Sequence, residues 1–264
     1  MPHLFSPEGK LALLAALERS PLLGFDFDGT LAPIVRTPGE ARVPLAISHR
    51  LQRLAARLPI AVVSGRSLTD LTERLEFPAH YVVGNHGAEI SGDGRADSEQ
   101  GLDAMRELLQ THDANLRCAG VVVEDKGMSL ALHYRLARNP RQALGLIRAI
   151  LQPFHARFRV FSGKMVENVT ASGAPDKADA MLLLVRRCGA PCAVFFGDDV
   201  NDEPVFGSAP DDWVTVRVGR DNYGSQADFF IYHPSEMAMV LDGMLLHVNA
   251  KQAGPSDHNE LLDT

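Results

Sequence analysis

Two aspartates two positions apart, Asp26 and Asp28, are the clearest candidates for chemistry in this sequence. They follow the apolar run Pro21–Phe25, which predicts a short strand, and side chains two apart on a strand point the same way. Two carboxylates so close repel each other and are costly to desolvate, so a divalent cation bound through oxygen is the simplest compensation. One carboxylate is then free to attack as a nucleophile and the other to move a proton. The alternative interpretation is an acidic turn after a core strand.

A second acidic cluster follows the predicted strand Ala193–Phe196. Its acids cannot lie near the first pair without a cation, and magnesium prefers carboxylate oxygens. We expect Asp198 to bind magnesium directly, Asp199 to act directly or through water, and Asp202 to orient Lys177 or a metal-bound water. The alternative is a helix N-terminus, where acidic residues are favoured. The predicted Mg²⁺ ligands are Asp26, Asp28, Asp198 and Asp199.

A third polar group, Ser64-Gly65-Arg66, ends the predicted strand Pro59–Val63. A hydroxyl and a backbone amide beside a helix start can donate to a phosphoryl oxygen. Taken alone, Ser64 is better suited to capping a helix, but its position at a strand end of this pattern favours the ligand. Lys177 would neutralise phosphate charge and the crowded carboxylates; the alternative is a solvent-exposed lysine. These parts suit phosphoryl transfer, and the predicted catalytic residues are Asp26, Asp28, Lys177 and Ser64.

Strands and helices alternate over much of the chain, which predicts an α/β fold with a mainly parallel sheet. Ligands of such sheets bind beyond the carboxyl ends of the strands, so the three polar clusters should converge there. The middle of the chain differs, with helices predicted near 102–109 and 141–151 and strands near 120–124, 129–134, 156–161 and 165–168. We therefore predict a core in two parts, 1–99 and 171–248, an inserted cap at 100–170 with an antiparallel sheet, and a disordered tail at 249–264.

The four polar elements resemble, in order, the catalytic motifs of the haloacid dehalogenase (HAD) superfamily. The first is Asp26-Phe27-Asp28-Gly29-Thr30-Leu31, and the others are Ser64, Lys177 and the run Gly197–Glu203. The resemblance implies a Rossmann-like core with a cap, and Mg²⁺-dependent phosphatase chemistry through an aspartyl-phosphate. Asp26 would be the nucleophile, and Asp28 would be the general acid and then the base for the hydrolytic water.

Further runs resemble the trehalose-6-phosphate phosphatases. They are Ser64–Arg66, Gly84–Glu89, Glu124–Ser129, His133–Arg135 and Gly163–Glu167. The resemblance implies that Glu124, Lys126 and Glu167 bind sugar hydroxyls and that Lys164 lies near the phosphate or sugar. One departure is Asn201, where that family commonly has Thr in its fourth motif.

The residues themselves support part of this assignment. Glu124 and Lys126 are two apart and should face alike, although each could instead form a surface ion pair of little value. The fork of Arg66 suits phosphate or sugar oxygens, Asn85 and His86 follow a strand end, and His133 is interpreted as structural. The predicted substrate-binding residues are Gly65, Arg66, Asn85, His86, Glu124, Lys126, Lys164 and Glu167.

Composition narrows the class of protein. The 264 residues are 45% hydrophobic, and the net charge of −7 argues against a nucleic-acid-binding protein. The apolar run 11–17 is too short to span a membrane. Three cysteines, an odd number without zinc-type spacing, indicate a reduced, cytoplasmic setting.

Together these features predict an enzyme that hydrolyses trehalose 6-phosphate to trehalose and phosphate, with Mg²⁺ as cofactor and a small sugar phosphate as its partner. Trehalose-6-phosphate synthase would be a pathway neighbour. Two alternatives stay open. One is a phosphatase for another sugar phosphate, such as sucrose, glucosylglycerol or mannosylglycerate phosphate. The other is a sugar-phosphate sensor that binds without turnover, which would not need both a nucleophile and a proton donor.

Overall fold

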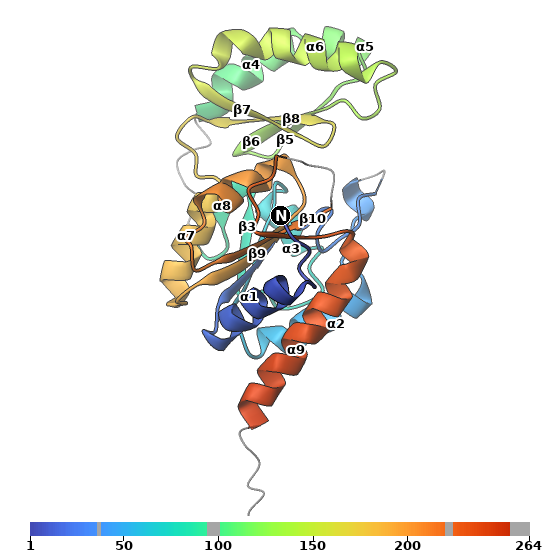
Figure 1. Cartoon of the computed structure of the whole chain (residues 1–264). Coiled ribbons are helices and arrows are strands. Elements are labelled where there is room, and N and C mark those ends of the chain that lie inside the picture. Colours follow the sequence, from blue (N-terminus) through green and yellow to red (C-terminus); the bar gives the residue numbers. More distant parts are fainter. Residues whose placement is uncertain (36–37, 94–100, 220–223, 254–264) are drawn as a thin grey trace, which may run out of the picture.

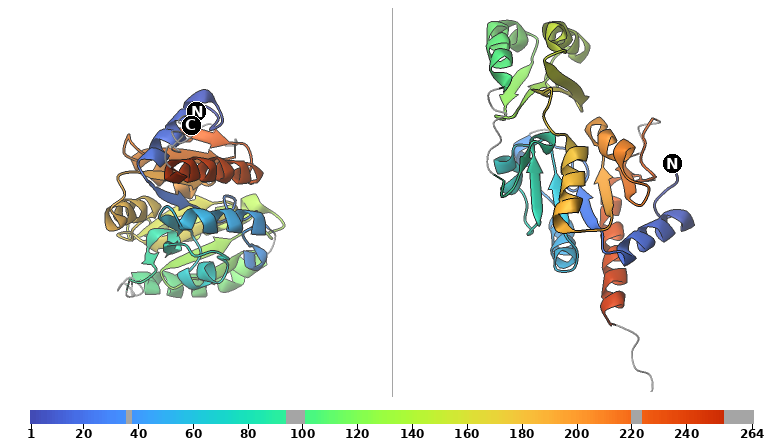
Figure 2. Two further views of the ribbon diagram at one scale, coloured as in Figure 1. Left: turned by 90° about the horizontal axis from the view of Figure 1, so that it is seen from below. Right: turned by 90° about the vertical axis from the view of Figure 1, so that its left-hand side faces the viewer.

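The computed structural model describes residues 1–35, 38–93, 101–219 and 224–253, and it has two parts. We call the part built on the larger sheet the core, and the part from α4 to β8 the cap. The cap lies beyond one end of the core strands (Figures 1 and 2). No helix among the described residues is long and apolar enough to cross a membrane.

The core sheet has seven strands within the described residues, in the order β11-β10-β9-β1-β2-β3-β4. All neighbouring strands are parallel except the last pair, β3 and β4. The strands are β1 (Leu22–Phe25), β2 (Ile60–Val63), β3 (Tyr81–Gly84), β4 (Glu89–Ile90), β9 (Ala193–Gly197), β10 (Val214–Val218) and β11 (Phe229–Ile231). The central strands are buried on both faces, which explains why they are continuous apolar runs in the sequence.

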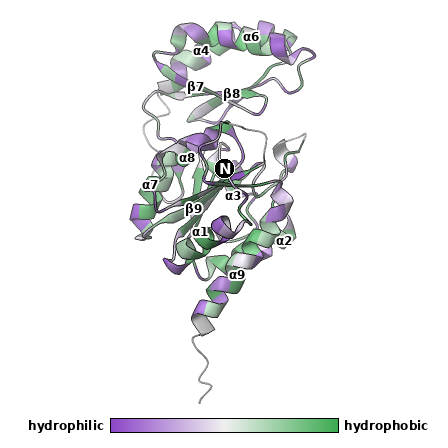
Figure 3. Cartoon of the chain, in the orientation of Figure 1, coloured by the Kyte–Doolittle hydropathy of each residue, from purple (hydrophilic) through white to green (hydrophobic). Residues whose placement is uncertain are grey.

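Helices cover both faces of this sheet (Figure 2). One face packs against α1 (Pro7–Glu18), α2 (Leu45–Ala55), α3 (Leu68–Thr72) and α9 (Met237–Ala253), and the other against α7 (Lys177–Cys188) and α8 (Glu203–Ser208). Short 3₁₀ turns lie at Pro38–Glu40, Asn85–Gly87, Gln152–Phe154, Val200–Asp202 and Pro234–Glu236. In Figure 3 the strands inside the core are mostly apolar, whereas the helices α4 and α6 carry both polar and apolar residues.

The cap has its own antiparallel sheet, in the order β5-β6-β8-β7. The strands are β5 (Val122–Asp125), β6 (Ser129–His133), β7 (Phe158–Gly163) and β8 (Val166–Ala171), and the helices are α4 (Asp103–Thr111), α5 (Asp113–Cys118) and α6 (Pro140–Leu151). The helices lie on the side of the sheet away from the core (Figure 1). The open face of the cap sheet is therefore turned toward the core.

The predicted fold class, a mainly parallel core with an inserted antiparallel cap, is confirmed. The helices α5 and α8 were not predicted, because each is a single short element of six residues without a clear apolar period. Helix α9 continues to Ala253, so the start of the expected tail is helical. The rest of that tail, 254–264, lies outside the described residues.

Candidate active site

Three core strands bring polar residues to one edge of the sheet. Asp26 follows β1, Ser64 follows β2 and Asp198 follows β9, and these three strands are parallel neighbours. The edge opens into a cavity of about 450 Å³ between core and cap. Of the predicted site residues, those that line it are Asp26, Asp28, Ser64, Gly65, Arg66, His86, Glu124, Lys126, Lys164, Asp198 and Asp199.

Lys177 is buried at the floor of this site, with 1% of its side chain exposed. Its Nζ donates to Asp26 Oδ1 and to Asp202 Oδ1, both at 2.7 Å. The other oxygen of Asp202 accepts the backbone amides of Asp198 at 2.9 Å and Asp199 at 3.0 Å. One buried ion-pair network therefore holds the candidate nucleophile and the second acidic cluster in a fixed relation. Asp202 thus contacts Lys177, one of the two groups that it was expected to orient.

Burial controls the protonation of these carboxyl groups. Burial raises the pKa of Asp26 well above its usual range, although the ammonium of Lys177 acts in the opposite sense. Burial raises the pKa of Asp198 to about 6, again opposed by a lysine, Lys164. Burial alone would lower the pKa of Lys177, but the carboxylates of Asp202 and Asp26 outweigh it and raise the pKa. At this end of the cavity, which we call the floor, the three carboxyl groups of Asp26, Asp198 and Asp202 thus outnumber the ammonium groups of Lys177 and Lys164.

A divalent cation fits this floor. Carboxylate oxygens of Asp26, Asp198 and Asp202 lie within 4.8 Å of one another, and Asp198 Oδ1 is buried without a hydrogen-bond partner. Gly29, at φ +91°, allows this approach, because a Cβ there would collide with the Asp198 carboxylate. Oxygen-rich, partly buried groups of this kind suit Mg²⁺.

Two predicted metal ligands lie outside that cluster of carboxylates. The carboxylate of Asp199 accepts the amides of Val200, at 2.8 Å, and Lys164, at 3.3 Å. Asp28 is held instead by Arg66, which donates to both of its oxygens at 2.6 and 2.7 Å. Both aspartates line the cavity, but of the two only Asp26 belongs to the cluster whose carboxylate oxygens lie within 4.8 Å of one another.

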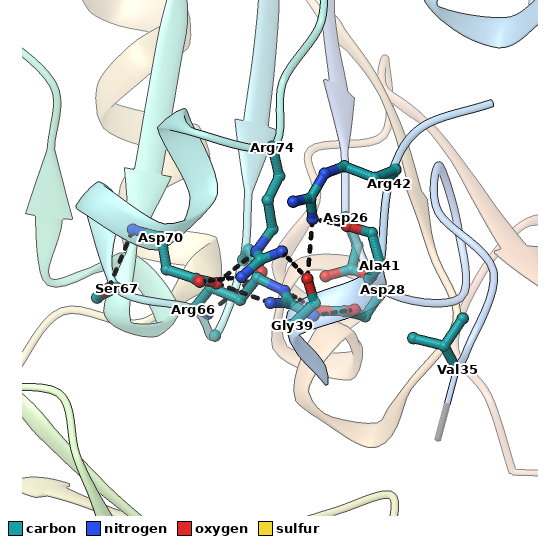
Figure 4. A network of polar contacts seen from close by, with 12 residues as sticks. Asp26, Asp28, Val35, Gly39, Ala41, Arg42, Arg66, Ser67, Asp70 and Arg74 are labelled. Carbon is teal, nitrogen blue, oxygen red and sulfur yellow. Dashed lines mark hydrogen bonds and ion pairs between the residues drawn. The ribbon is translucent and has the colours of Figure 1, made fainter. Parts of the chain in front are cut away.

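The Arg66–Asp28 pair belongs to a chain of alternating charges (Figure 4). Arg66 also donates to Asp70 at 2.7 Å, and Arg74 donates to Asp70 at 2.9 Å and to the carbonyl of Gly39 at 2.6 Å. The hydrogen bond from Arg74, followed by burial acting in the opposite sense and by the bond from Arg66, lowers the pKa of Asp70 to about 2. The carboxylate of Asp28 is therefore linked to α3 through Arg66 and Asp70.

The loop after β2 packs closely against the end of β3. A Cβ on Gly65 would collide with the ring of His86, which is 5% exposed and edge-on to Phe161 at 4.8 Å between ring centroids. Burial, with help from the charges of Lys126 and Lys177, holds the pKa of His86 well below its usual range. His86 is thus a neutral ring at the cavity wall. The Ser64 hydroxyl accepts the amide of Arg66 at 3.2 Å, within the same loop.

The cap supplies the opposite wall. Glu124 and Lys126 both line the cavity, as their spacing predicted, and their charged atoms lie 3.8 Å apart. His133 contacts Glu124 at 2.8 Å, and this hydrogen bond lowers the pKa of Glu124. Lys126 Nζ reaches the core and donates to the carbonyl of Gly65 at 2.9 Å, and Lys164 forms an ion pair with Asp198.

Two predicted substrate-binding residues are not among the described residues that line the cavity. Glu167 is 3% exposed, accepts from Ser162 at 2.7 Å and pairs with Arg148 of α6 at 3.3 Å. It lies on the helix side of the cap sheet, because neighbours on a strand face opposite ways. Asn85 is fully buried and bonds to the cap turn after β5.

Five polar lining residues were not predicted as ligands: Asp70, His133, Arg135, Asn168 and Asn201. Asn168 comes directly after Glu167 and takes the cavity-facing position on β8, and His133 and Arg135 lie at the end of β6. Strand alternation was the available signal for Asn168, but the register of β8 was needed to choose between the two neighbours.

Comparison with known proteins gives the family. The family model described as trehalose-phosphatase matches residues 24–227. The trehalose-phosphate phosphatase of Mycobacterium tuberculosis (strain H37Rv) is 33% identical over 240 residues, which cover 85% of this chain and 61% of that protein. The chain thus spans about 61% of the length of the first curated relatives that it matches.

Solved structures agree on the fold. The C-terminal domain of C. albicans trehalose-6-phosphate phosphatase superposes with a TM-score of 0.76 at 20% identity, covering 94% of this chain and 98% of that one. A HAD subclass IIB sugar phosphatase superposes with a TM-score of 0.58 at 17% identity, covering 88% and 99%. With a family model that matches most of its length, this chain belongs to the trehalose-phosphatase family.

Proposed function

We propose that this chain is a Mg²⁺-dependent phosphatase that hydrolyses trehalose 6-phosphate to trehalose and phosphate through an aspartyl-phosphate. The observation that carries the proposal is Asp26, held by the buried Lys177 at the floor of a cavity whose far wall is the cap. Relatives named trehalose-phosphate phosphatase support the same assignment. The odd number of cysteines supports a cytoplasmic location, and trehalose-6-phosphate synthase would supply the substrate.

Asp26 and Asp198 would hold the ion. Both oxygens of Asp202 are already used by Lys177 and by two backbone amides, so Asp202 acts by holding those groups. Asp28 and Asp199 would contribute from farther away, through water. A bound divalent cation would neutralise charge on the phosphoryl group and on the carboxylates around it.

In the first step a carboxylate oxygen of Asp26 attacks phosphorus, and the bond from phosphorus to the sugar oxygen breaks. Asp28 gives its proton to that leaving oxygen. In the second step a water attacks phosphorus, Asp28 takes the proton of the water, and Asp26 is released with inorganic phosphate. Asp28 is suited to both transfers, because it lines the cavity and its side chain is 40% exposed.

Charge neutralisation and positioning must supply most of the acceleration of phosphoryl transfer. Lys177 stabilises the ionised form of Asp26 against burial, and the Ser64 hydroxyl and Gly65 amide lie at the same wall of the cavity. Glu124, Lys126 and Lys164 on the cap face would read the hydroxyls of the sugar. A cavity of about 450 Å³ is within the usual range for small-molecule sites.

The test is phosphate release from trehalose 6-phosphate beside a panel of sugar phosphates, with and without Mg²⁺, using Asp26→Asn as the control. A strong, Mg²⁺-dependent preference for trehalose 6-phosphate is expected. Preference for another sugar phosphate would support the proposed phosphatase reaction but contradict trehalose 6-phosphate as the substrate. No turnover of any of them by folded protein would favour the sensor.

A further inference from the structure

Cap and core touch at several points, some around the cavity and others away from it. Arg135 of the cap donates to the carbonyl of Val35 at 3.0 Å, and Lys164 pairs with Asp198. Both of these basic residues line the cavity, where substrate would compete for them and a cation would compete with Lys164 for Asp198. A further contact is built around Asn85, which is fully buried and is not among the residues that line the cavity.

Asn85 comes from the core but bonds mainly to the cap. Its Oδ1 accepts the hydroxyl of Ser129 at 2.5 Å, and its Nδ2 donates to the carbonyl of Lys126 at 3.2 Å. Nδ2 also donates at 2.7 Å to Glu89, which in turn accepts the amide of Leu68 at 3.0 Å. One amide side chain thus connects the cap to β4 and α3. We call Asn85 and Ser129, with their mutual hydrogen bond, the Asn85 latch.

The latch acts on a tight turn of the cap. The amide of Lys126 donates to the carbonyl of Ser129 at 2.9 Å, and Gly127 between them has φ +81°. The turn is therefore closed by its own backbone hydrogen bond, and the side chain of Asn85 attaches it to the core. The same turn carries Lys126, whose ammonium lies 2.9 Å from the carbonyl of Gly65 in the loop after β2.

Burial of the Asn85 latch favours the arrangement in which the cap turn is bonded to the core. Ser129 is 1% exposed and Asn85 is 0% exposed, so neither can exchange its partner for water without movement of the cap. Buried polar groups that lose a partner are costly, so the closed arrangement is favoured wherever both groups are present. Asn85 also has φ +47°, a conformation that Asn tolerates better than most residues.

We propose that Asn85 and Ser129 are positioning residues. They hold the cap turn so that the ammonium of Lys126 stays next to the carbonyl of Gly65, where it can bind the sugar. The inference rests on the proposed function and deepens it, because it gives Asn85 a role other than substrate contact. A substrate without a sugar does not need Lys126 and should not need the latch.

The variant to use is Ser129→Ala, because Ser129 lies in a regular strand whereas Asn85 has a left-handed backbone that alanine would strain. The matched control is Ser91→Ala, which removes a hydroxyl that accepts the amide of Val82 at 3.1 Å, within the core. Ser129→Ala should lower kcat/KM for trehalose 6-phosphate about tenfold, the loss expected for one buried hydrogen bond. Hydrolysis of p-nitrophenyl phosphate should change less than about twofold.

A double-mutant cycle separates positioning from general damage. If the latch acts through Lys126, Ser129→Ala should have little further effect in a Lys126→Ala background. Additive losses on trehalose 6-phosphate, or equal losses on both substrates, would overturn the proposal. Ser129→Thr, which keeps the hydroxyl, should restore most of the activity.

A readout independent of turnover keeps the latch distinct from the proposed function. Amide hydrogen exchange at residues 126–129 and 85–89 should speed up in Ser129→Ala and not in Ser91→Ala. Unchanged exchange there would refute the latch even in an active enzyme. If the wild type prefers another sugar phosphate, the cycle is run on that substrate; if it hydrolyses none, the proposed function fails and exchange alone decides.

Discussion

The two walls of the cavity hold their charges in different ways. On the core floor Asp26, Lys177 and Asp202 are 5%, 1% and 0% exposed, and Lys177 bonds to both aspartates. On the cap wall the side chains of Glu124 and His133 are 51% and 33% exposed. Ion pairs at such exposure contribute little to stability, whereas buried ones lose much when a partner is removed.

The difference in burial between floor and cap wall suits two tasks, catalysis and recognition of the sugar. A buried network fixes the nucleophile in one geometry, which is what a reaction that depends on positioning needs. The half-exposed Glu124 and His133 can exchange their mutual contact for sugar hydroxyls at little cost. We therefore expect floor variants to affect every phosphate ester and cap variants to affect sugar phosphates selectively.

The strongest test of the floor is Asp26→Asn. The amide cannot form the aspartyl-phosphate, so kcat should fall about 10⁴-fold or more on every substrate. Steady-state phosphate release measures this, with Asp212→Asn, at a surface pair with Arg19, as the control. Substantial residual turnover would show that Asp26 is not the nucleophile.

Lys177→Met tests whether the floor also carries stability. It leaves two buried carboxylates without their cation, and the free energy of unfolding should drop by about 3–5 kcal/mol. Denaturant unfolding without divalent cations is the measurement. The control is Lys10→Met, at an exposed position of α1, which should change the free energy of unfolding by less than about 0.5 kcal/mol. A similarly small change for Lys177→Met would contradict the difference in stability between the floor and the cap wall.

Lys126→Ala tests the cap wall. Loss of a charged hydrogen-bond donor to the sugar should reduce kcat/KM for trehalose 6-phosphate by about 10- to 100-fold. Turnover of p-nitrophenyl phosphate should stay within about twofold of wild type. Equal losses on the two substrates would mean that Lys126 serves the phosphate and not the sugar.

Asp70, in core helix α3 and bonded to Arg66 and Arg74, gives the smallest effect. Its pKa is lowered to about 2 from 3.8, so its ionised form stabilises the fold. This contribution is present above about pH 4 and is lost as the pH falls toward 2. Asp70→Asn should cost about 1 kcal/mol at pH 7 after allowance for solvent screening, and the difference from wild type should shrink between pH 4 and 2. A difference independent of pH would argue that packing, and not charge, is responsible.

Much of the core could be predicted from local patterns. Apolar runs marked the parallel strands, and polar residues just after them marked the site, because parallel strands end at one edge of a sheet. Asp26, Ser64 and Asp198 meet there for that reason. Glu124 and Lys126 face the cavity together because two residues apart on a strand share a face.

The sequence by itself determined which residues share a face and which strands end in reactive groups. It did not determine which face of β8 meets the cavity, so Glu167 was chosen where Asn168 lies. It did not show that Asn85 bonds to Ser129 across 44 positions, or that Arg66 holds Asp28 across 38. A period of two is a local property of the chain, whereas the choice of face and partner depends on how the cap docks on the core. Tertiary packing alone decides that.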